Sequence, residues 1–178
     1  MESTPALLLR RTRFSETSLI ITWLTLHHGK LKTIAKGALR PKNAFAGLLD
    51  LFFELDIAFV RSRKSEIHTL RETVLLEPHE GLRREYARVE LAAYFVELVE
   101  LATEPEHPVP EIYDLLKRAL GYLNTQGPGR KALLYFEKEL ARLLGLHAGG
   151  NPYLALSRAL HRLPANRGEL LKRWPEEG

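Results

Sequence analysis

The stretch LIITWLTLHHGKLKTIAKGALRPK, residues 19–42, decides the fold class. β-Branched residues occur in both halves, with Trp23 in the first, and His28-Gly29-Lys30 between them has the composition of a tight turn. We predict two strands, Leu19 to Leu26 and Leu31 to Ala38, joined as a hairpin. Proline lacks the amide hydrogen that a strand interior needs, so residues 40–43, Arg-Pro-Lys-Asn, are expected to form a loop.

Short apolar segments flank this hairpin on both sides, and none has the length or period of a helix. They predict three more strands, Leu7 to Arg11, Phe52 to Val60 and His68 to Leu75. In the middle one, apolar side chains at odd positions from Phe53 to Phe59 alternate with polar or small ones. This is the pattern of a strand with one buried face and one face toward water. Five such strands fit an OB-fold barrel, which we predict for residues 1–78.

The period of the apolar residues changes after Glu77-Pro78. From Leu82 to about Leu101 they recur every three or four residues, which indicates an amphipathic helix. Breakers rich in Gly and Pro separate three further predicted helices, Pro110 to Leu123, Arg130 to Leu144 and Pro152 to His161. The tail after Pro164 either docks or frays. We therefore predict an α+β protein with an all-helical domain over residues 79–178.

Positive charge is concentrated in the barrel segment. Residues 1–74 contain 12 basic and 7 acidic residues, whereas residues 75–178 contain 14 and 15. Between Arg10 and Lys42, eight basic residues stand against a single acid, Glu16. Such asymmetry favours a polyanion as the partner. Lys and Arg side chains that neutralise phosphates release condensed counterions, which gives affinity for DNA without sequence readout.

Evenly spaced lysines form the centre of the expected DNA-binding surface. Lys30, Lys32 and Lys36 share one face of the predicted strand, because side chains two residues apart point to the same side. The alternative is a solvated strand face, although such faces normally intersperse both signs of charge. The side chains that we expect to contact DNA are Arg10, Arg11, Lys30, Lys32, Lys36, Arg40, Lys42 and Arg61.

Single-strand binders also stack bases on aromatic side chains. Phe45 lies in the basic loop and is the best candidate for base stacking. Trp23 lies in an apolar strand and is expected in the core. Phe14 either stacks on bases or is buried at the end of the barrel.

The sequence lacks the residue patterns of common catalytic and metal sites. It has no cysteine, which excludes disulfides, thiolate zinc sites, iron–sulfur clusters and thiol nucleophiles. The seven histidines lack metal-ligand spacing, and there is no Walker or Gly-x-Ser-x-Gly motif. We therefore expect no enzymatic activity, no metal and no cofactor. No apolar run reaches the roughly 20 residues that span a bilayer, and the N-terminus is unlike a signal peptide, so we expect a cytoplasmic protein without membrane contact.

Several segments resemble the RecO family of bacterial DNA repair proteins. In order and spacing they are Leu7 to Arg11, Phe14 to Leu19, Thr25 to Leu31, Ala35 to Lys42, Leu48 to Phe52, Leu91 to Leu98 and Phe136 to Leu146. The resemblance implies an OB barrel that binds single- and double-stranded DNA and anneals complementary strands. It also implies that the protein acts with RecR to load RecA onto strands coated by single-stranded DNA-binding protein, in association with the nucleoid.

The sequence departs from the family at one point. Many members have a zinc-binding cysteine cluster after the helix that ends at Leu144-Gly145-Leu146, and here residues 147–152 continue without cysteine. The helical domain is therefore expected to be stabilised by packing, through Leu133, Phe136, Leu140, Leu143 and Leu144. The charge pattern also permits an alternative function, a basic OB-fold interaction module that binds RNA or an acidic protein tail.

Overall fold

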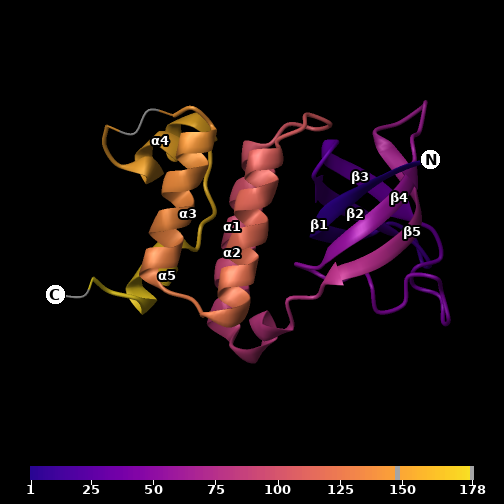
Figure 1. The fold of residues 1–178 in the computed structure, drawn as a ribbon, viewed down its shortest axis with the longest axis horizontal. Coiled ribbons are helices and arrows are strands. Elements are labelled where there is room, and N and C mark those ends of the chain that lie inside the picture. The colour runs from indigo at the N-terminus through magenta and orange to yellow at the C-terminus, as the bar shows by residue number, and fades with distance from the viewer. Residues whose placement is uncertain (147–148, 177–178) are drawn as a thin grey trace. The chain divides into compact units, whose positions relative to one another are not determined.

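The structure, a computed structural model, describes residues 1–146 and 149–176 (Figure 1). Its contacts divide the chain into two compact units. One comprises Met1–Pro78 with Thr103–Tyr113, and the other comprises His79–Ala102 with the residues from Asp114 onward. The segment 103–113 thus returns to the barrel unit, which differs from the predicted helical domain over 79–178. Residues 147 and 148, where the expected cysteine-free segment begins, lie outside the described residues.

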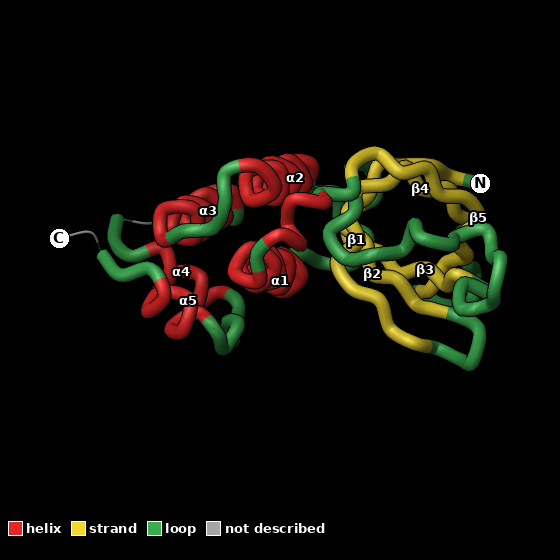
Figure 2. Tube along the Cα trace, turned by 90° about the horizontal axis from the view of Figure 1, so that it is seen from below, coloured by secondary structure: helices red, strands yellow, loops and turns green. Residues whose placement is uncertain are grey.

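The first unit contains a closed barrel of five strands, as predicted. The strands are β1 (Glu2–Arg13), β2 (Leu19–Thr25), β3 (Gly29–Ala35), β4 (Glu54–Val60) and β5 (Ile67–Glu77). They follow the order β1-β2-β3-β5-β4, and β4 also pairs with β1, so that the ring closes (Figure 2). Neighbouring strands are antiparallel except β3 and β5, which pair in parallel between Lys32–Ile34 and Ile67–Thr69. This is the OB-type barrel that the sequence predicted.

Glycines at both ends of β3 define its length. Gly29 has a φ of 70°, and a Cβ atom there would lie 2.1 Å from the carbonyl oxygen of His107. Both the left-handed backbone and the close approach require glycine at this position. β3 ends at Ala35, three residues earlier than predicted, and Gly37 with a φ of 72° then turns the chain. Lys36 therefore lies just beyond the strand.

The core of the barrel is formed by the inward-facing side chains of its strands. Trp23 is fully buried, as expected, and its Nε1 donates a hydrogen bond of 2.9 Å to the Thr33 hydroxyl. Leu55, Ile57 and Phe59 of β4 are also fully buried. The alternating pattern of β4 thus predicted its buried face correctly.

The polar face of β4 is partly covered. Glu54 is only 3% exposed and accepts a hydrogen bond of 2.7 Å from the Tyr113 hydroxyl. Burial and the adjacent carboxylate raise the pKa of Tyr113, so the phenol remains a donor. The expectation that this whole face meets water is wrong at Glu54, because the return segment 103–113 packs against it.

The second unit is helical. It contains a short 3-10 helix, η1 (Glu80–Arg84), and α1 (Tyr86–Ala102), most of α2 (Pro110–Thr125), α3 (Arg130–Leu143), α4 (Pro152–Ala159) and α5 (Arg167–Arg173). The helix predicted from Leu82 thus begins as η1 and restarts at Tyr86. The tail docks as α5, where Leu170 is buried. None of the described helices has the length and apolar character that a membrane span requires.

Apolar packing in the helical unit centres on α3. Leu133, Phe136 and Leu140 are buried, as predicted, whereas Leu143 and Leu144 are half-buried. Phe136 stacks on Phe95 of α1, with 4.0 Å between the ring centroids. These contacts join α1 to α3.

An ion pair to a buried carboxylate supplements this packing. Glu137 of α3 is 1% exposed and lies 2.5 Å from Nε and 2.8 Å from Nη2 of Arg167 in α5. The Tyr94 hydroxyl of α1 donates to the same carboxylate over 2.5 Å, and the Arg167 guanidinium lies 3.8 Å from the centre of the Tyr153 ring. One carboxylate thus connects α1, α3 and α5. Packing arguments from the sequence did not include this link.

Candidate nucleic-acid interface

Two cations lie on one line across the outer face of β1, β2 and β3. Arg10 pairs with Thr22, and Thr22 pairs with Lys32. Residues opposite each other in a sheet point to the same side. Adjacent strands lie about 4.8 Å apart, so Arg10 and Lys32 are about 10 Å apart across the row. Both side chains are exposed, whereas Thr22 between them is buried.

The next row toward the end of the barrel is less polar. Thr12, Ile20 and Ile34 lie opposite one another in the same three strands. Ile20 and Ile34 are half-buried. The outer face therefore combines partly exposed apolar side chains with flanking cations.

The turn after β3 adds three exposed cations, Lys36, Arg40 and Lys42. Hydrogen bonds order this turn: the Leu39 amide donates to the Thr17 carbonyl and the Arg40 amide to the Gly37 carbonyl, each over 2.9 Å. The Asn43 side-chain amide also donates to the Arg40 carbonyl over 2.7 Å. The three cations therefore stand on a fixed backbone.

Most of these cations lack an acidic partner. Within residues 1–146 and 149–176, no ion pair joins Lys32, Lys36, Arg40 or Lys42 to a carboxylate. We refer to the set Arg10, Lys32, Lys36, Arg40 and Lys42 as the cationic face. Its members come from the outer face of β1 and β3 and from the turn after β3. Their contact with DNA stays a prediction.

Arg11 has a different environment from Arg10. Its Nη1 donates to the Leu49 carbonyl over 2.8 Å, and its Nη2 lies 3.5 Å from the Asp50 carboxylate. These contacts connect β1 to the loop before β4. Arg11 is therefore engaged in the fold, although about half of its side chain is exposed.

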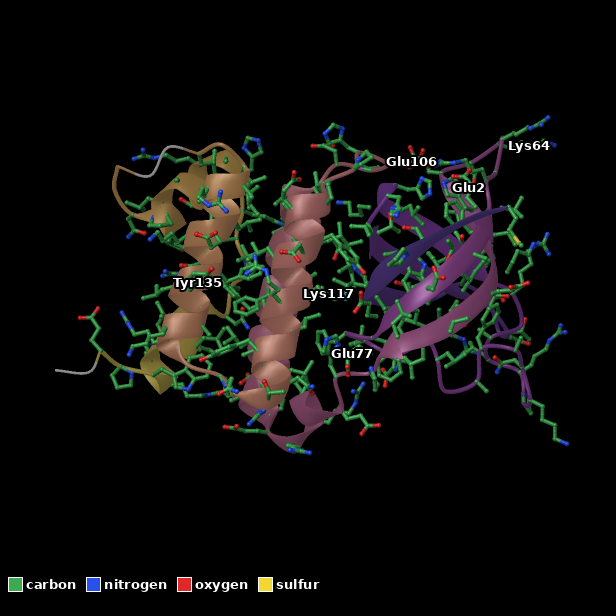
Figure 3. The ribbon with its side chains drawn as sticks, viewed as in Figure 1. Glu2, Lys64, Glu77, Glu106, Lys117 and Tyr135 are labelled. Carbon is green, nitrogen blue, oxygen red and sulfur yellow. The ribbon has the colours of Figure 1, made fainter. Side chains whose placement is uncertain are left out.

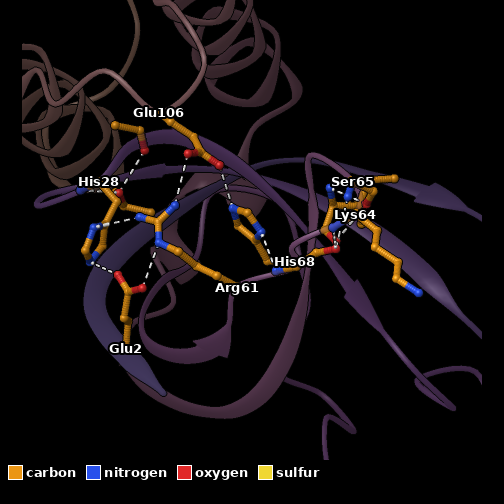
Figure 4. A network of polar contacts seen from close by, with 11 residues as sticks. Glu2, His28, Arg61, Lys64, Ser65, His68 and Glu106 are labelled. Atoms are coloured by element: carbon orange, nitrogen blue, oxygen red, sulfur yellow. Dashed lines mark hydrogen bonds and ion pairs between the residues drawn. The ribbon is translucent and has the colours of Figure 1, made fainter.

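The other two expected DNA contacts, Lys30 and Arg61, lie near the opposite end of the strands. Arg61 lies between two carboxylates, with its Nε 2.7 Å from Glu2 and its Nη1 3.0 Å from Glu106 (Figure 4). The hydrogen bond from Arg61 lowers the pKa of Glu2, and the same bond raises the pKa of Arg61. Both groups therefore stay charged and compensate each other. Arg61 thus belongs to an ion-pair network, and its expected contact with DNA stays a prediction.

A buried histidine belongs to the same network. The Ser62 amide donates to Nδ1 of His68 over 3.2 Å, so Nε2 carries the proton and donates to Glu106 over 2.6 Å. We refer to Glu2, His28, Arg61, His68 and Glu106 as the Arg61 cluster. It stabilises the return segment on the barrel.

Backbone contacts place Lys30 beside that segment. The Glu106 amide donates to the Lys30 carbonyl over 2.7 Å, and Lys30 forms a bridge with Pro105. Lys30 and Lys32 also line a groove of about 570 Å³, together with residues of the β4–β5 loop. At the tip of that loop Lys64 extends away from the barrel (Figure 3).

The aromatic residues differ most from the prediction. Phe45 is only 8% exposed and packs in the barrel core with Leu49, so it cannot serve as an open stacking surface. The loop folds inward because the Phe45 amide donates to the Asn43 side chain over 2.8 Å, which turns the chain toward the barrel. Phe14, in contrast, is 60% exposed. The alternation of a strand does not extend into such loops, so sequence alone left Phe14 open and misjudged Phe45.

Comparisons with known proteins agree with this barrel and helical unit. Family models described as recombination protein O, N terminal and C terminal, match residues 1–79 and 83–148. The chain belongs to the RecO family. It is 35% identical to DNA repair protein RecO of Rhodopirellula baltica over 140 residues, which are 79% of this chain and 52% of that protein. It is 33% identical to the proteins of the same name from Salinibacter ruber and Myxococcus xanthus, over 80% and 79% of this chain and 55% and 57% of theirs. The chain thus spans about half the length of these RecO relatives.

The helical unit of this RecO family member has a second surface of interest. An apolar groove of about 420 Å³ lies between α2 and α3, lined by residues that include Phe95, Leu115 and Tyr135. Arg118 and Lys131 also line it. Figure 3 shows Tyr135 on α3. In the part of the chain that the structure describes, no group of three or more His, Asp or Glu side chains is arranged to hold a metal ion.

Proposed function

We propose that the protein binds single- and double-stranded DNA through the cationic face of its barrel. The observation that carries this proposal is the set of five exposed cations on β1, β3 and the turn after β3, four of which form no ion pair with a described carboxylate. Cations without partners neutralise phosphates without first breaking an ion pair. A row of charges also suits the repeating phosphates of a strand, and it reads no sequence.

We further propose that the bound strands are annealed. A surface that screens phosphate repulsion lowers the barrier to bringing two complementary strands together, and no covalent bond forms or breaks. The protein would therefore act as a mediator in DNA repair and not as an enzyme. With RecR it would help to load RecA onto strands coated by single-stranded DNA-binding protein, at the nucleoid in the cytoplasm. The name DNA repair protein, which the relatives share, supports this proposal.

The helical unit is the proposed contact region for protein partners. Its groove between α2 and α3 is apolar, and Lys131 at that groove adds positive charge, whereas Arg118 is paired with Asp114 over 2.7 Å. Such a surface suits a partner segment that combines apolar and acidic side chains.

A salt series with a matched charge control tests the DNA-binding proposal. The variant Lys36→Ala/Arg40→Ala/Lys42→Ala removes three charges from the cationic face. Lys138→Ala/Arg158→Ala/Lys172→Ala removes the same residue types from exposed positions of the helical unit. Anisotropy of a labelled single-stranded oligonucleotide is measured at increasing salt for both variants and the parent chain.

We expect the log–log salt slope of the first variant to become shallower by about 2, since each phosphate contact with a single strand contributes roughly 0.7. The control should keep the parental slope. Annealing of complementary oligonucleotides in the same samples should slow only in the first variant. Equal slopes in all three proteins would show that the cationic face is not the DNA site. If unlabelled RNA displaces the labelled strand better than unlabelled DNA does, the RNA-binding alternative is favoured.

A further inference from the structure

We infer that Phe14 is a stacking platform for an unpaired base, which makes the cationic face select single-stranded over double-stranded DNA. The inference rests on the proposed DNA binding and adds the substrate class. It assigns to Phe14 the role that the sequence analysis gave to Phe45.

Exposure separates Phe14 from every other aromatic side chain of the barrel unit. Phe14 is 60% exposed, whereas the remaining described Phe, Trp and Tyr side chains of that unit are buried or half-buried. An exposed phenyl ring loses the free energy that burial would provide. A single exposed aromatic residue is ordinary on a protein surface, and it is the surroundings of Phe14 that point to a ligand.

The backbone that bears Phe14 is rigid. The amides of Phe14 and Ser15 both donate to the Ser18 carbonyl, over 3.0 and 3.4 Å. The Ser15 hydroxyl accepts hydrogen bonds from the amides of Thr17 and Ser18, over 3.3 and 3.1 Å. Arg13 Nε donates to the Ser15 carbonyl over 3.1 Å. The β1–β2 turn thus presents the ring on an ordered frame, which reduces the entropy lost on binding.

The β1–β2 turn also contacts the turn after β3, which carries three members of the cationic face. The Leu39 amide donates to the Thr17 carbonyl over 2.9 Å, and the Gly37 amide lies 3.4 Å from the Ser18 hydroxyl. Gly37 and Leu39 lie between two cations of the face in the sequence, Lys36 and Arg40. Leu39 is itself 43% exposed. The accessible ring therefore belongs to a turn that is hydrogen-bonded to the turn bearing Lys36 and Arg40.

This arrangement matches a single strand better than a duplex. Stacking on a side chain requires a base face that is not already covered by its neighbours, and paired bases inside a duplex do not offer one. Every base has a π-face, so stacking needs no particular sequence. Phosphates are available in both forms of DNA. Loss of the ring should therefore weaken binding to single strands and leave the phosphate contribution intact.

The test compares Phe14→Ala with Phe14→Trp and with a control, Tyr86→Ala. Tyr86 is 73% exposed at the start of α1, so its removal also deletes an exposed ring. Affinity for a labelled oligo-dT strand and for a duplex of equal length is measured by anisotropy across a salt series, and unfolding curves establish that each variant is folded.

We expect Phe14→Ala to bind the single strand at least about fivefold more weakly, the lower limit for loss of one stacked base. Duplex affinity and the salt slope should stay at parental values. Phe14→Trp should retain single-strand binding, and Tyr86→Ala should resemble the parent. If Phe14→Ala binds the single strand as tightly as the parent, or weakens both forms of DNA equally, the stacking assignment is wrong. In that case the salt slope of the Lys36/Arg40/Lys42 variant still decides the proposed function separately.

Discussion

Lys36, Arg40 and Lys42 stand on an ordered turn without an ion-pair partner among the described carboxylates, whereas Arg61, near the other end of the strands, lies between Glu2 and Glu106. Both regions contribute to the positive charge of residues 1–74. Their surroundings give them different roles, because the free cations are available to a polyanion and the paired one stabilises the fold. The net charge predicts the class of partner, and ion pairing within the protein decides which cations are free to contact that partner.

Arg167 extends this comparison to a half-buried cation whose carboxylate partner, Glu137, is buried, and its removal should have the largest effect. We expect Arg167→Ala to lower the free energy of unfolding by about 3–5 kcal/mol, because it leaves the Glu137 carboxylate buried without its cation. Denaturant unfolding measures the change. Arg158→Ala, an exposed arginine in α4, should be nearly neutral; similar losses in both variants would contradict the role of burial.

Lys32 tests an unpaired member of the cationic face on its own. We expect Lys32→Ala to remove one phosphate contact. Single-strand binding should then weaken about fivefold at 0.1 M salt, and the log–log salt slope should become shallower by roughly 0.7. Stability should stay within about 0.5 kcal/mol, as for other exposed positions. Lys64→Ala is the matched control, since Lys64 is an exposed lysine on the β4–β5 loop. Equal weakening by both substitutions would show that only overall charge matters.

Arg61→Ala should have the opposite effect from the Lys32 substitution, a change in stability without a change in DNA binding. We expect DNA affinity near the parental value and a loss of at most about 1 kcal/mol in unfolding free energy, because the pairs are well exposed and screened by solvent. Anisotropy and denaturant unfolding on one preparation separate the two effects. A large drop in DNA binding with unchanged stability would place Arg61 back in the DNA interface.

The smallest expected effect is on the pH dependence of stability. Arg61 lowers the pKa of Glu2 below its ordinary value of 4.5. The contribution of Glu2 to stability is therefore present above about pH 4.5 and is lost as the pH falls through the lower pKa of the folded state. In Arg61→Ala, the fall in melting temperature between about pH 5 and 3 should be slightly shallower. An unchanged acid profile would show that this pair contributes nothing.

The local sequence pattern predicted the strands well, but it did not predict the long-range contacts of their side chains. The apolar alternation of β4 and the buried Trp23 follow from the period of a strand, and the cations of β3 follow from the same period. The Arg61 cluster does not, because Glu2 and Glu106 are 59 and 45 residues away from Arg61 in sequence. The inward fold of Phe45 and the return of residues 103–113 also depend on tertiary contacts. Sequence spacing carries no signal for any of these.

Lysine footprinting tests the central claim most directly. The protein is acetylated at its lysines with and without an excess of oligo-dT, and the modification at each lysine is measured by mass spectrometry. The cationic face predicts that DNA protects Lys32, Lys36 and Lys42, while Lys64 and Lys138 react at the same rate in both samples. Unchanged modification of the first three, or protection of Lys64 and Lys138 instead, would contradict the claim that DNA binds on this face of the barrel.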